Sequence, residues 1–392
     1  MENETNRRGL LFDHRQLGLF PVHRLRRVDK PTNLVTDAIK RVDGREAALA
    51  KAERGDYGPS VAKAAHPILP LKYPVSAAIF DVAQNITSIN EKKAAAFRAP
   101  VTDDPAVLSR HIKRLGYFLQ ADVVGICRLP KSAVYSHDFD GNPVDIDFQN
   151  AIVLVMRKEP RTLAASTGND WIGDAISFQA YLRLAIAAET IAGYIKRLGY
   201  PASSQSMVAG YQVLIPQLLL WAGIGEVSRL GIILNPFLGL AFKAAAVLTD
   251  MPLEPDKPVD FGLQDFCRRC KICAEACPSR AIPTGDKVMH NGYETWKLDE
   301  RRCSIYSVTN RKGTICEVCI KACPWTRPNT WPHNLVRRAV ADSALARRLA
   351  IKSSRLLGYG RPEVEEKWWF DLHYTEEDGA LKIPPGSDLS TS

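Results

Sequence analysis

Eight of the nine cysteines in this 392-residue chain lie between Cys267 and Pro324. The first group reads C-R-R-C-K-I-C-A-E-A-C-P over 267–278, so gaps of two, two and three residues are followed by a proline. Three thiolates at this close spacing bind three irons of one [4Fe–4S] cube, and the fourth cysteine reaches a neighbouring cube. These residues therefore predict iron–sulfur chemistry, in which electrons are transferred.

The second cysteine group repeats the pattern with one wider gap. Cys303 stands apart, and three further cysteines follow in the run C-E-V-C-I-K-A-C-P over 316–324. If the last cysteine of each group crosses to the other cube, each cube receives four thiolates. The predicted ligands are Cys267, Cys270, Cys273 and Cys323 for one cluster, and Cys303, Cys316, Cys319 and Cys277 for the other.

A zinc site, disulfide bonds and a single cluster fit these cysteines less well. A structural zinc site uses two C-x2-C pairs, not triplets followed by C-P. Disulfide bonds need an oxidising compartment, and a chain of this length does not need them for stability. A single cluster would leave four cysteines without a role. We therefore expect two [4Fe–4S] clusters.

The rest of the chain must position the clusters and use their electrons. A two-cluster domain takes about 60–80 residues, and the 46% apolar composition supports a substantial further core. Residues 1–100, which prolines divide into short pieces, predict an arm around the body with helices near 33–53 and 90–98. The sequence thus predicts a catalytic body with built-in electron carriers.

The middle of the chain predicts one α/β layer. The hexapeptide I-K-R-L-G-Y occurs at 112–117 and at 195–200, each time at the end of a helical pattern and before an extended segment. Cys127, in an apolar strand pattern, is interpreted as a small core residue. The predicted elements are a helix over 105–115 capped by Asp104 and stopped by Gly116, strands at 121–129 and 151–156, and a helix over 178–198 stopped by Gly199.

Charge and targeting signals suggest a location and partners. The net charge is +9, and residues 301–360 contain twelve Lys or Arg and two acids. This segment is either a solvated helix face or a docking patch for an acidic electron donor; no nucleic-acid recognition module accompanies it. The apolar run after Arg7-Arg8 is too short for an export signal, and the run 230–248 is too interrupted to span a membrane. We expect a cytoplasmic protein without a transmembrane segment or nucleic-acid partner.

Several longer strings add a family resemblance. They are A-G-I-G-E-V-S-R-L-G at 222–231, N-P-F-L-G at 235–239, V-L-T-D-M-P-L-E-P-D-K-P-V-D-F-G at 247–262, N-G-Y-E-T-W at 291–296 and I-C-E-V-C-I-K-A-C-P-W at 315–325. Together they resemble the cobalamin-dependent reductive dehalogenases, over a stretch from about 104 to 330. The resemblance implies a nitroreductase-like α/β core that holds a corrinoid against a ferredoxin-like double-cluster domain.

The resemblance also implies an arrangement of the chain. The expected parts are an arm at 1–100, a corrinoid-binding catalytic core at 101–260, a ferredoxin-like two-cluster domain at 261–335, and a C-terminal helix and tail at 336–392 that pack on the core. Residues expected to contact the corrinoid come from the quoted strings: Gly223, Gly225, Glu226, Arg229, Asn235, Asn291 and Trp296.

A proton donor is implied as well. In the family it is a tyrosine early in the helix that ends at the leucine-glycine-tyrosine turn, and here Tyr181 matches. Its partner is a basic residue before the T-D-x-P string, which is Lys243. A phenol with a pKa near 10 is an adequate acid, and a nearby ammonium stabilises the phenolate that it leaves.

The resemblance makes an organohalide the expected substrate, and an aromatic one is favoured. Electrons would come from a separate ferredoxin or flavodoxin with its reductase, because no reductase sequence is fused here. The string D-L-H-Y-T-E at 371–376 is not D-x-H-x-x-G, so we expect a base-off corrinoid. Two alternatives are a related corrinoid iron–sulfur reductase of a non-halogenated substrate, such as epoxyqueuosine reductase, and a non-catalytic iron–sulfur electron carrier.

Overall fold

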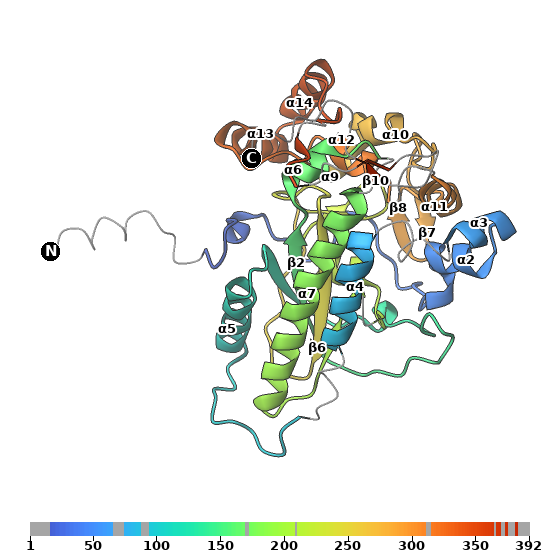
Figure 1. Cartoon of the computed structure of the whole chain (residues 1–392). Coiled ribbons are helices and arrows are strands. Elements are labelled where there is room, and N and C mark those ends of the chain that lie inside the picture. The colour runs from blue at the N-terminus through green and yellow to red at the C-terminus, as the bar shows by residue number, and fades with distance from the viewer. Residues whose placement is uncertain are drawn as a thin grey trace, which may run out of the picture.

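A four-stranded antiparallel sheet forms the centre of the protein, in the strand order β1–β2–β6–β3 (Figure 1). Its strands are β1 (Val123–Arg128), β2 (Asn150–Arg157), β3 (Ala202–Gln205) and β6 (Phe242–Thr249). The computed structural model describes residues 16–65, 74–87, 94–168, 172–207, 210–310, 315–363, 366–369, 373–374 and 381–382. The expected α/β fold class is confirmed.

Helices cover both faces of the sheet. One face packs on α5 (Pro105–Phe118) and on the long α7 (Ile172–Arg197), and the other packs on α8 (Ile215–Trp221). Residues of β2 alternate between the two cores, with Ile152 and Leu154 toward α7 and Val153 and Val155 toward α8. A strand buried on both faces is apolar throughout, which explains the continuous apolar run of β2.

The two I-K-R-L-G-Y repeats precede the two edge strands. The first ends α5 before β1, and the second ends α7 before β3. Gly199 stops α7 with a φ of +88°, as predicted. Gly116, however, was wrongly predicted as a stop: α5 continues to Phe118, and Gln120 takes the left-handed conformation with a φ of 68°. A Cβ on Gly116 would lie 2.8 Å from Val124 Cγ2, so this glycine allows close helix–sheet packing.

The cysteine-rich segment lies at the end of the sheet where α7 begins (Figure 1). It contains α9, α10, the β7–β8 hairpin, α11 and α12. Two helices follow, α13 and α14, and their Val340 and Ile351 belong to the same apolar core as Cys267 and Cys270. The bounds are α9 Leu263–Cys270, α10 Ile272–Glu275, β7 Val288–His290, β8 Tyr293–Thr295, α11 Glu300–Thr309, α12 Val318–Ala322, α13 Trp331–Asp342 and α14 Ala344–Leu356.

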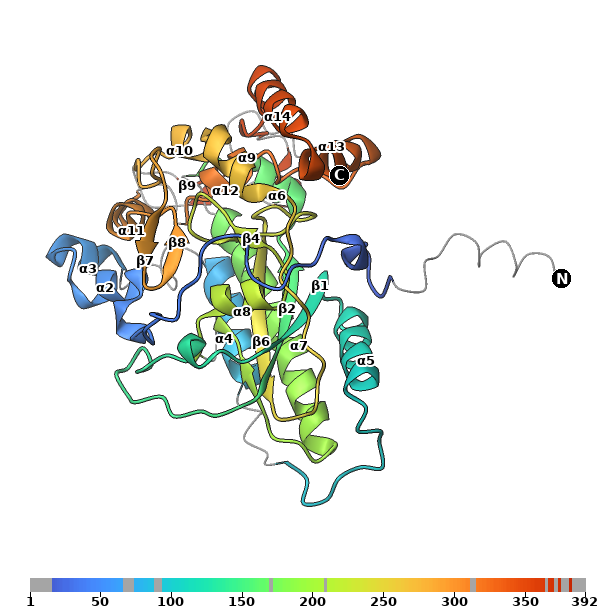
Figure 2. The same ribbon diagram turned by 180° about the vertical axis from the view of Figure 1, so that it is seen from behind.

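The N-terminal residues run along the outside of both parts. The Val28 amide donates to the Pro258 carbonyl at 2.9 Å, and the Thr36 amide donates to the Gly292 carbonyl at 2.9 Å. Farther along, α2 (Ala48–Arg54) and α3 (Pro59–Ala65) pack against α11, whereas α4 (Pro74–Thr87) packs along α7 (Figure 2). This segment therefore contacts both the part of the protein built on the central sheet and the cysteine-rich segment.

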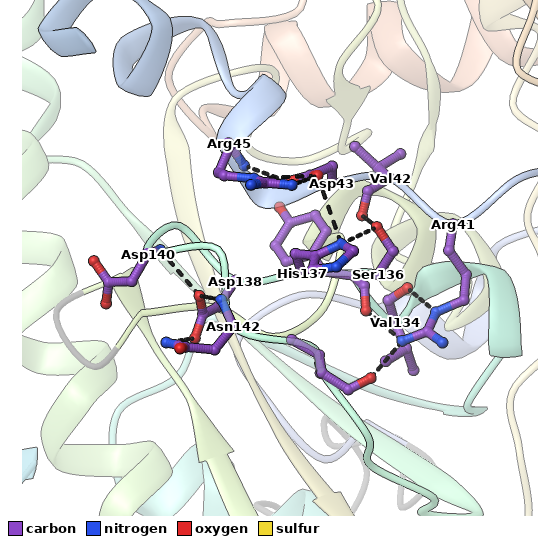
Figure 3. A network of polar contacts seen from close by, with 12 residues as sticks. Arg41, Val42, Asp43, Arg45, Val134, Ser136, His137, Asp138, Asp140 and Asn142 are labelled. Carbon is purple, nitrogen blue, oxygen red and sulfur yellow. Dashed lines mark hydrogen bonds and ion pairs between the residues drawn. The ribbon is translucent and has the colours of Figure 1, made fainter.

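Helices in the arm are shorter than predicted. Within 33–53 the helical residues are η2 (Gly44–Glu46) and the first part of α2. Residues 94–98 are not helical, and 90–93 lie outside the described residues. The arm is instead fastened by polar contacts: the Arg41 guanidinium donates to the carbonyls of Val134, Tyr135 and Val144, and the Ser136 amide donates to the Val42 carbonyl. Figure 3 shows Arg41 beside Val134 and the Ser136 hydroxyl beside the Val42 carbonyl.

Among the described residues, no helix is both long and apolar enough to cross a membrane. The arginine pair at 7–8 and most of the 371–376 string lie outside those residues. The remaining elements are η1 (Val22–Arg24), η5 (Lys131–Ala133), α6 (Pro160–Ala165), β4 (Glu226–Val227), β5 (Ile233–Leu234), β9 (His373–Tyr374) and β10 (Leu381–Lys382).

The β4–β5 hairpin gives a test of the packing. A Cβ on Gly225 would lie 2.0 Å from the Leu234 carbonyl oxygen, and the contact is with backbone, which leaves little room for adjustment. Gly225→Ala should therefore lower the free energy of unfolding by about 1–3 kcal/mol, the usual range for overpacking. Gly285→Ala is the matched control, because its Cβ would meet nothing within 4 Å. Chemical denaturation of both variants measures the difference, and equal stability would contradict the packing.

Candidate active site

The four cysteines predicted for the first cluster lie together. Cys267 and Cys270 are in α9, Cys273 is in α10, and Cys323 follows α12. All four are buried, and they line one small cavity with Trp325. Burial, together with the neighbouring thiols, raises the pKa of the Cys267 thiol. A group that binds thiolates, as iron does, would supply the counter-charge that this apolar site lacks.

The other four cysteines also face one another. Cys303 is on α11, Cys316 and Cys319 flank the start of α12, and Cys277 follows α10. The Cys316 pKa is raised to about 11, by burial first and then by the nearby Cys303 and Cys277. The Ala281 amide donates to Cys277 Sγ at 3.3 Å. Ligation of clusters by these two sets stays a prediction, with a donor chemistry that fits it.

Arg229 and Glu226 join the core to the cysteine-rich segment. The buried Arg229 guanidinium donates to the carbonyls of Cys267, Arg268, Pro283 and Gly285 and lies 4.7 Å from the centroid of the Trp296 ring. The buried Glu226 carboxylate accepts the amides of Phe261 and Leu263 at the start of α9. Both residues act as parts of this joint.

The remaining residues expected to contact a corrinoid also have protein neighbours. Asn235 donates to the Ile224 carbonyl at 2.7 Å, and Asn291 exchanges hydrogen bonds with the backbone of Lys40. A Cβ on Gly223 would lie 2.2 Å from the Lys257 carbonyl oxygen. Contact between a corrinoid and any of Gly223, Gly225, Glu226, Arg229, Asn235, Asn291 and Trp296 stays a prediction, and the observed contacts give all seven a structural reason.

Tyr181 and Lys243 lie next to each other at the end of the sheet nearest the cysteines. Lys243 Nζ lies 4.9 Å from the centroid of the Tyr181 ring. Lys243 is opposite Met156 in the β2–β6 register, and Tyr181 is on α7, which covers that face. The Phe178 ring meets Tyr181 edge-on at 6.2 Å, and Phe80 meets Phe178 in the same way at 6.0 Å. An aromatic wall thus adjoins the tyrosine–lysine pair.

A buried ion pair lies beside Tyr181, and no sequence motif predicted it. Lys158 donates to Glu317 Oε1, and their side chains are 0% and 1% exposed. Ser177, one turn before Tyr181 on α7, donates to the same oxygen at 2.9 Å. Burial raises the Tyr181 pKa to about 12; the Lys158 ammonium opposes this, and Glu317 reinforces it. The net direction is therefore opposite to the lowering expected from a nearby ammonium.

Similarity to known proteins begins with the cysteines. Residues 266–326 match the family described as "4Fe-4S dicluster domain". The fold matches that of the catabolic reductive dehalogenase NpRdhA with a TM-score of 0.88 and 37% identity, over 94% of this chain and 54% of that one. The chain resembles the reductive dehalogenases. Its expected resemblance is thereby confirmed, and NpRdhA is also known in complex with 3-bromo-4-hydroxybenzoic acid.

Two tetrachloroethene reductive dehalogenases are similar in sequence. That of Sulfurospirillum multivorans is 28% identical over 309 residues, which are 69% of this chain and 61% of that protein. That of Desulfitobacterium hafniense strain Y51 is 34% identical over 226 residues, which are 55% of this chain and 40% of that protein. The chain therefore spans between 40% and 61% of the length of these dehalogenases.

The crossed ligand sets can be tested by single substitutions. The anaerobically reconstituted protein should hold about eight irons. Cys323→Ala should perturb the same cluster as Cys270→Ala, and Cys277→Ala the same cluster as Cys316→Ala, because each pair shares a set. Iron analysis and electron paramagnetic resonance (EPR) measure this.

Cys127→Ala is the matched control for these substitutions. Cys127 is buried, like Cys270 and Cys323, but it lies in β1, where its thiol faces the Leu218 carbonyl. This variant should keep all of its iron. If Cys277→Ala and Cys270→Ala instead affect the same cluster, the crossed assignment is wrong.

Proposed function

We propose that this protein is a reductive dehalogenase, which replaces a halogen of an organohalide by hydrogen. The observation that carries the proposal is the Tyr181–Lys243 pair beside two sets of four thiols, in a chain 37% identical to a reductive dehalogenase over 94% of its length. The overall reaction takes two electrons and one proton and releases the halide ion. Thiol-bound clusters would supply the electrons, and Tyr181 the proton.

Two [4Fe–4S] clusters and a base-off corrinoid are the proposed cofactors. The two thiol sets fit the clusters, as described above. Phe80, Leu182 and Met207 form a small apolar group; Ser76 lies one turn before Phe80 on α4, and Ser206 directly precedes Met207. Among the described residues these two buried hydroxyls have no hydrogen-bond partner. Unpartnered hydroxyls beside an aromatic wall fit a large ligand with both apolar and amide surface, as a corrinoid has.

A bound corrinoid would supply reducing power for cleavage of the carbon–halogen bond, and the protein would supply the proton. With a pKa of about 12, Tyr181 keeps its proton at neutral pH and gives it only to a strongly basic carbon. Lys243, over the ring, stabilises the electron-rich phenolate that remains. Tyr181 is partly buried against the core that α7 covers, and we propose its hydroxyl, not bulk water, as the source of the proton.

We propose an aromatic halide as the substrate. The aromatic side chains of Phe178 and Phe80 adjoin Tyr181, and offset or edge-on contacts favour a flat ring. The similar dehalogenase NpRdhA has been crystallised with a brominated hydroxybenzoic acid, whereas the two sequence relatives are named for tetrachloroethene. Measuring the turnover of halophenols and halogenated hydroxybenzoates beside that of tetrachloroethene tests whether aromatic halides are preferred.

Tyr181→Phe tests the proton donor. The substitution removes one hydroxyl and almost no volume, so the iron content and both cluster signals should remain. Dehalogenation should fall about 100-fold or more, which is the usual scale for loss of a general acid. Halide release under single-turnover conditions measures the step. Tyr211→Phe is the matched control, because the Tyr211 hydroxyl donates to the Ala244 carbonyl at 2.9 Å. Near-normal halide release by Tyr181→Phe would exclude Tyr181 as the donor.

Electrons would enter beside the first thiol set. A cavity of about 840 Å³ lies there, between the arm, α13 and the residues that follow Cys323. Accessible basic side chains predominate in its lining: Arg24, Arg26, Arg157, Arg327, Arg337, Arg338 and Arg361, against Asp260, Asp342 and Glu363. The lining also includes Lys158 and Lys321, which are buried and do not face a partner. An acidic partner suits this surface, so we propose a ferredoxin or flavodoxin, kept reduced by its reductase in the cytoplasm.

Arg338 is the better test of donor docking, and Arg337 is not suitable. Arg337 is engaged by the carbonyls of Trp325 and Arg327 and by the side chains of Asn329 and Asn334, so its loss would disturb the fold. Arg338 is exposed. Arg338→Glu should slow reduction by an acidic protein donor, and the difference from wild type should shrink as salt rises. Arg110→Glu on α5, outside the lining of this cavity, changes the net charge equally; equal slowing by both would exclude docking here.

A further inference from the structure

The Lys158–Glu317 pair connects two parts of the protein that the sequence separates by 159 residues. Lys158 directly follows β2, and Glu317 stands between Cys316 and Cys319 with a φ of +53°. The Lys158 amide donates to the Ala241 carbonyl at 2.9 Å, so the lysine continues the pairing of β2 with β6. One partner thus belongs to the sheet and the other to the loop that carries the second thiol set.

The same geometry brings the pair to Tyr181. Side chains two residues apart on a strand share a face, so Lys158 lies on the face of Met156 and Lys243, which α7 covers. Ser177 and Tyr181 are four residues apart on α7 and therefore share a side of that helix. Because Ser177 donates to Glu317 Oε1, the carboxylate contacts both the lysine and the tyrosine helix.

A purely stabilising role does not explain this arrangement. Replacing a buried ion pair by apolar residues of similar volume is often neutral or stabilising. Here, among the described residues, the second carboxylate oxygen of Glu317 is buried and has no hydrogen-bond partner. An unpaired buried acceptor is destabilising. The pair therefore lowers the stability of the folded protein, and this points to a functional reason for it.

We propose that Lys158 and Glu317 form an electrostatic link between the second thiol set and Tyr181, with Lys158 as a second cation, besides Lys243, that stabilises the phenolate. This inference rests on the proposed dehalogenase function. Two observations support it: Glu317 contacts both Lys158 and Ser177 of the tyrosine helix, and the Lys158 ammonium is the main charge that lowers the pKa of Tyr181 against the effect of burial. Lys158 and Glu317 are positioning residues in this account, because they act on the proton donor through its surroundings.

The link predicts opposite shifts in the cluster midpoint potential for substitutions of Glu317 and of Lys158. Reduction adds negative charge to a cluster, so a nearby anion disfavours the reduced state and a nearby cation favours it. In the holoenzyme, Glu317→Gln should raise the midpoint potential of the cluster at Cys316, and Lys158→Met should lower it. The cluster at Cys270 should shift less. A redox titration followed by EPR gives both potentials.

The tyrosine end is tested in the same variants. Lys158→Met should lower the rate of halide release about tenfold in single turnover and leave KM unchanged, because the phenolate loses a counter-charge. In the Tyr181→Phe background the same substitution should have no further effect, since the two residues act together. Lys113→Met is the matched control: it removes another lysine of an ion pair, with Asp256 at the edge strand β1, and should change neither reading.

Glu317→Gln is the conservative variant, so its effects can be separated from those of misfolding. Glu317→Gln keeps the size of the side chain and its contacts with Lys158 and Ser177, so its iron content should equal that of the wild type. Unchanged potentials with full iron, or shifts of the same sign in both variants, would overturn the link and leave the pair as a structural latch. A protein that shows the opposite shifts but releases no halide would support the electrostatic link while refuting the dehalogenase function.

Discussion

The buried Arg229 guanidinium is the interaction on which the two halves of the protein depend. It leaves the hairpin of the core, stacks on Trp296 and donates to four carbonyls of the cysteine-rich segment. Because two of those carbonyls belong to Cys267 and Arg268, the charge fixes α9 directly. A buried cation held only by carbonyls and a ring needs all of its contacts, so the joint has one geometry.

Because this joint is fixed, it also sets the distance between the two thiol sets and Tyr181. The second thiol set meets the core at the start of α7, where Gly168 approaches Cys316: a Cβ there would lie 3.4 Å from the sulfur. Tyr181 is further along the same helix, at the level of Lys243. The first set lies beside the basic cavity instead. The two sets therefore have unequal positions: the buried first set lies beside the basic cavity, and the partly exposed second set lies beside the start of α7.

Sequence patterns correctly predicted the features that depend only on residues close together in the chain. Cysteine spacing grouped the thiols as the structure does, and the α7 stop at Gly199 needs only a left-handed residue after a helix. Gly116 was misread because glycine serves equally as a stop and as a point of close contact. The seven residues expected at a corrinoid were chosen by string similarity, which does not distinguish a ligand contact from a joint. Lys158 and Glu317 could not be paired in advance, because the sheet and the loop bring them together only in the folded chain.

The path of the N-terminal arm has a consequence for how the protein is made. Thr36 bonds to Gly292, which is 256 residues later, and α2 and α3 rest on α11. At about 5–20 residues per second, a ribosome needs roughly 13–50 seconds to reach those partners. During that time Val61 and Ala65 have no apolar surface of α11 to cover them. Although the arm is synthesised first, its contacts with α11 and the β7–β8 hairpin can form only after most of the chain has left the ribosome.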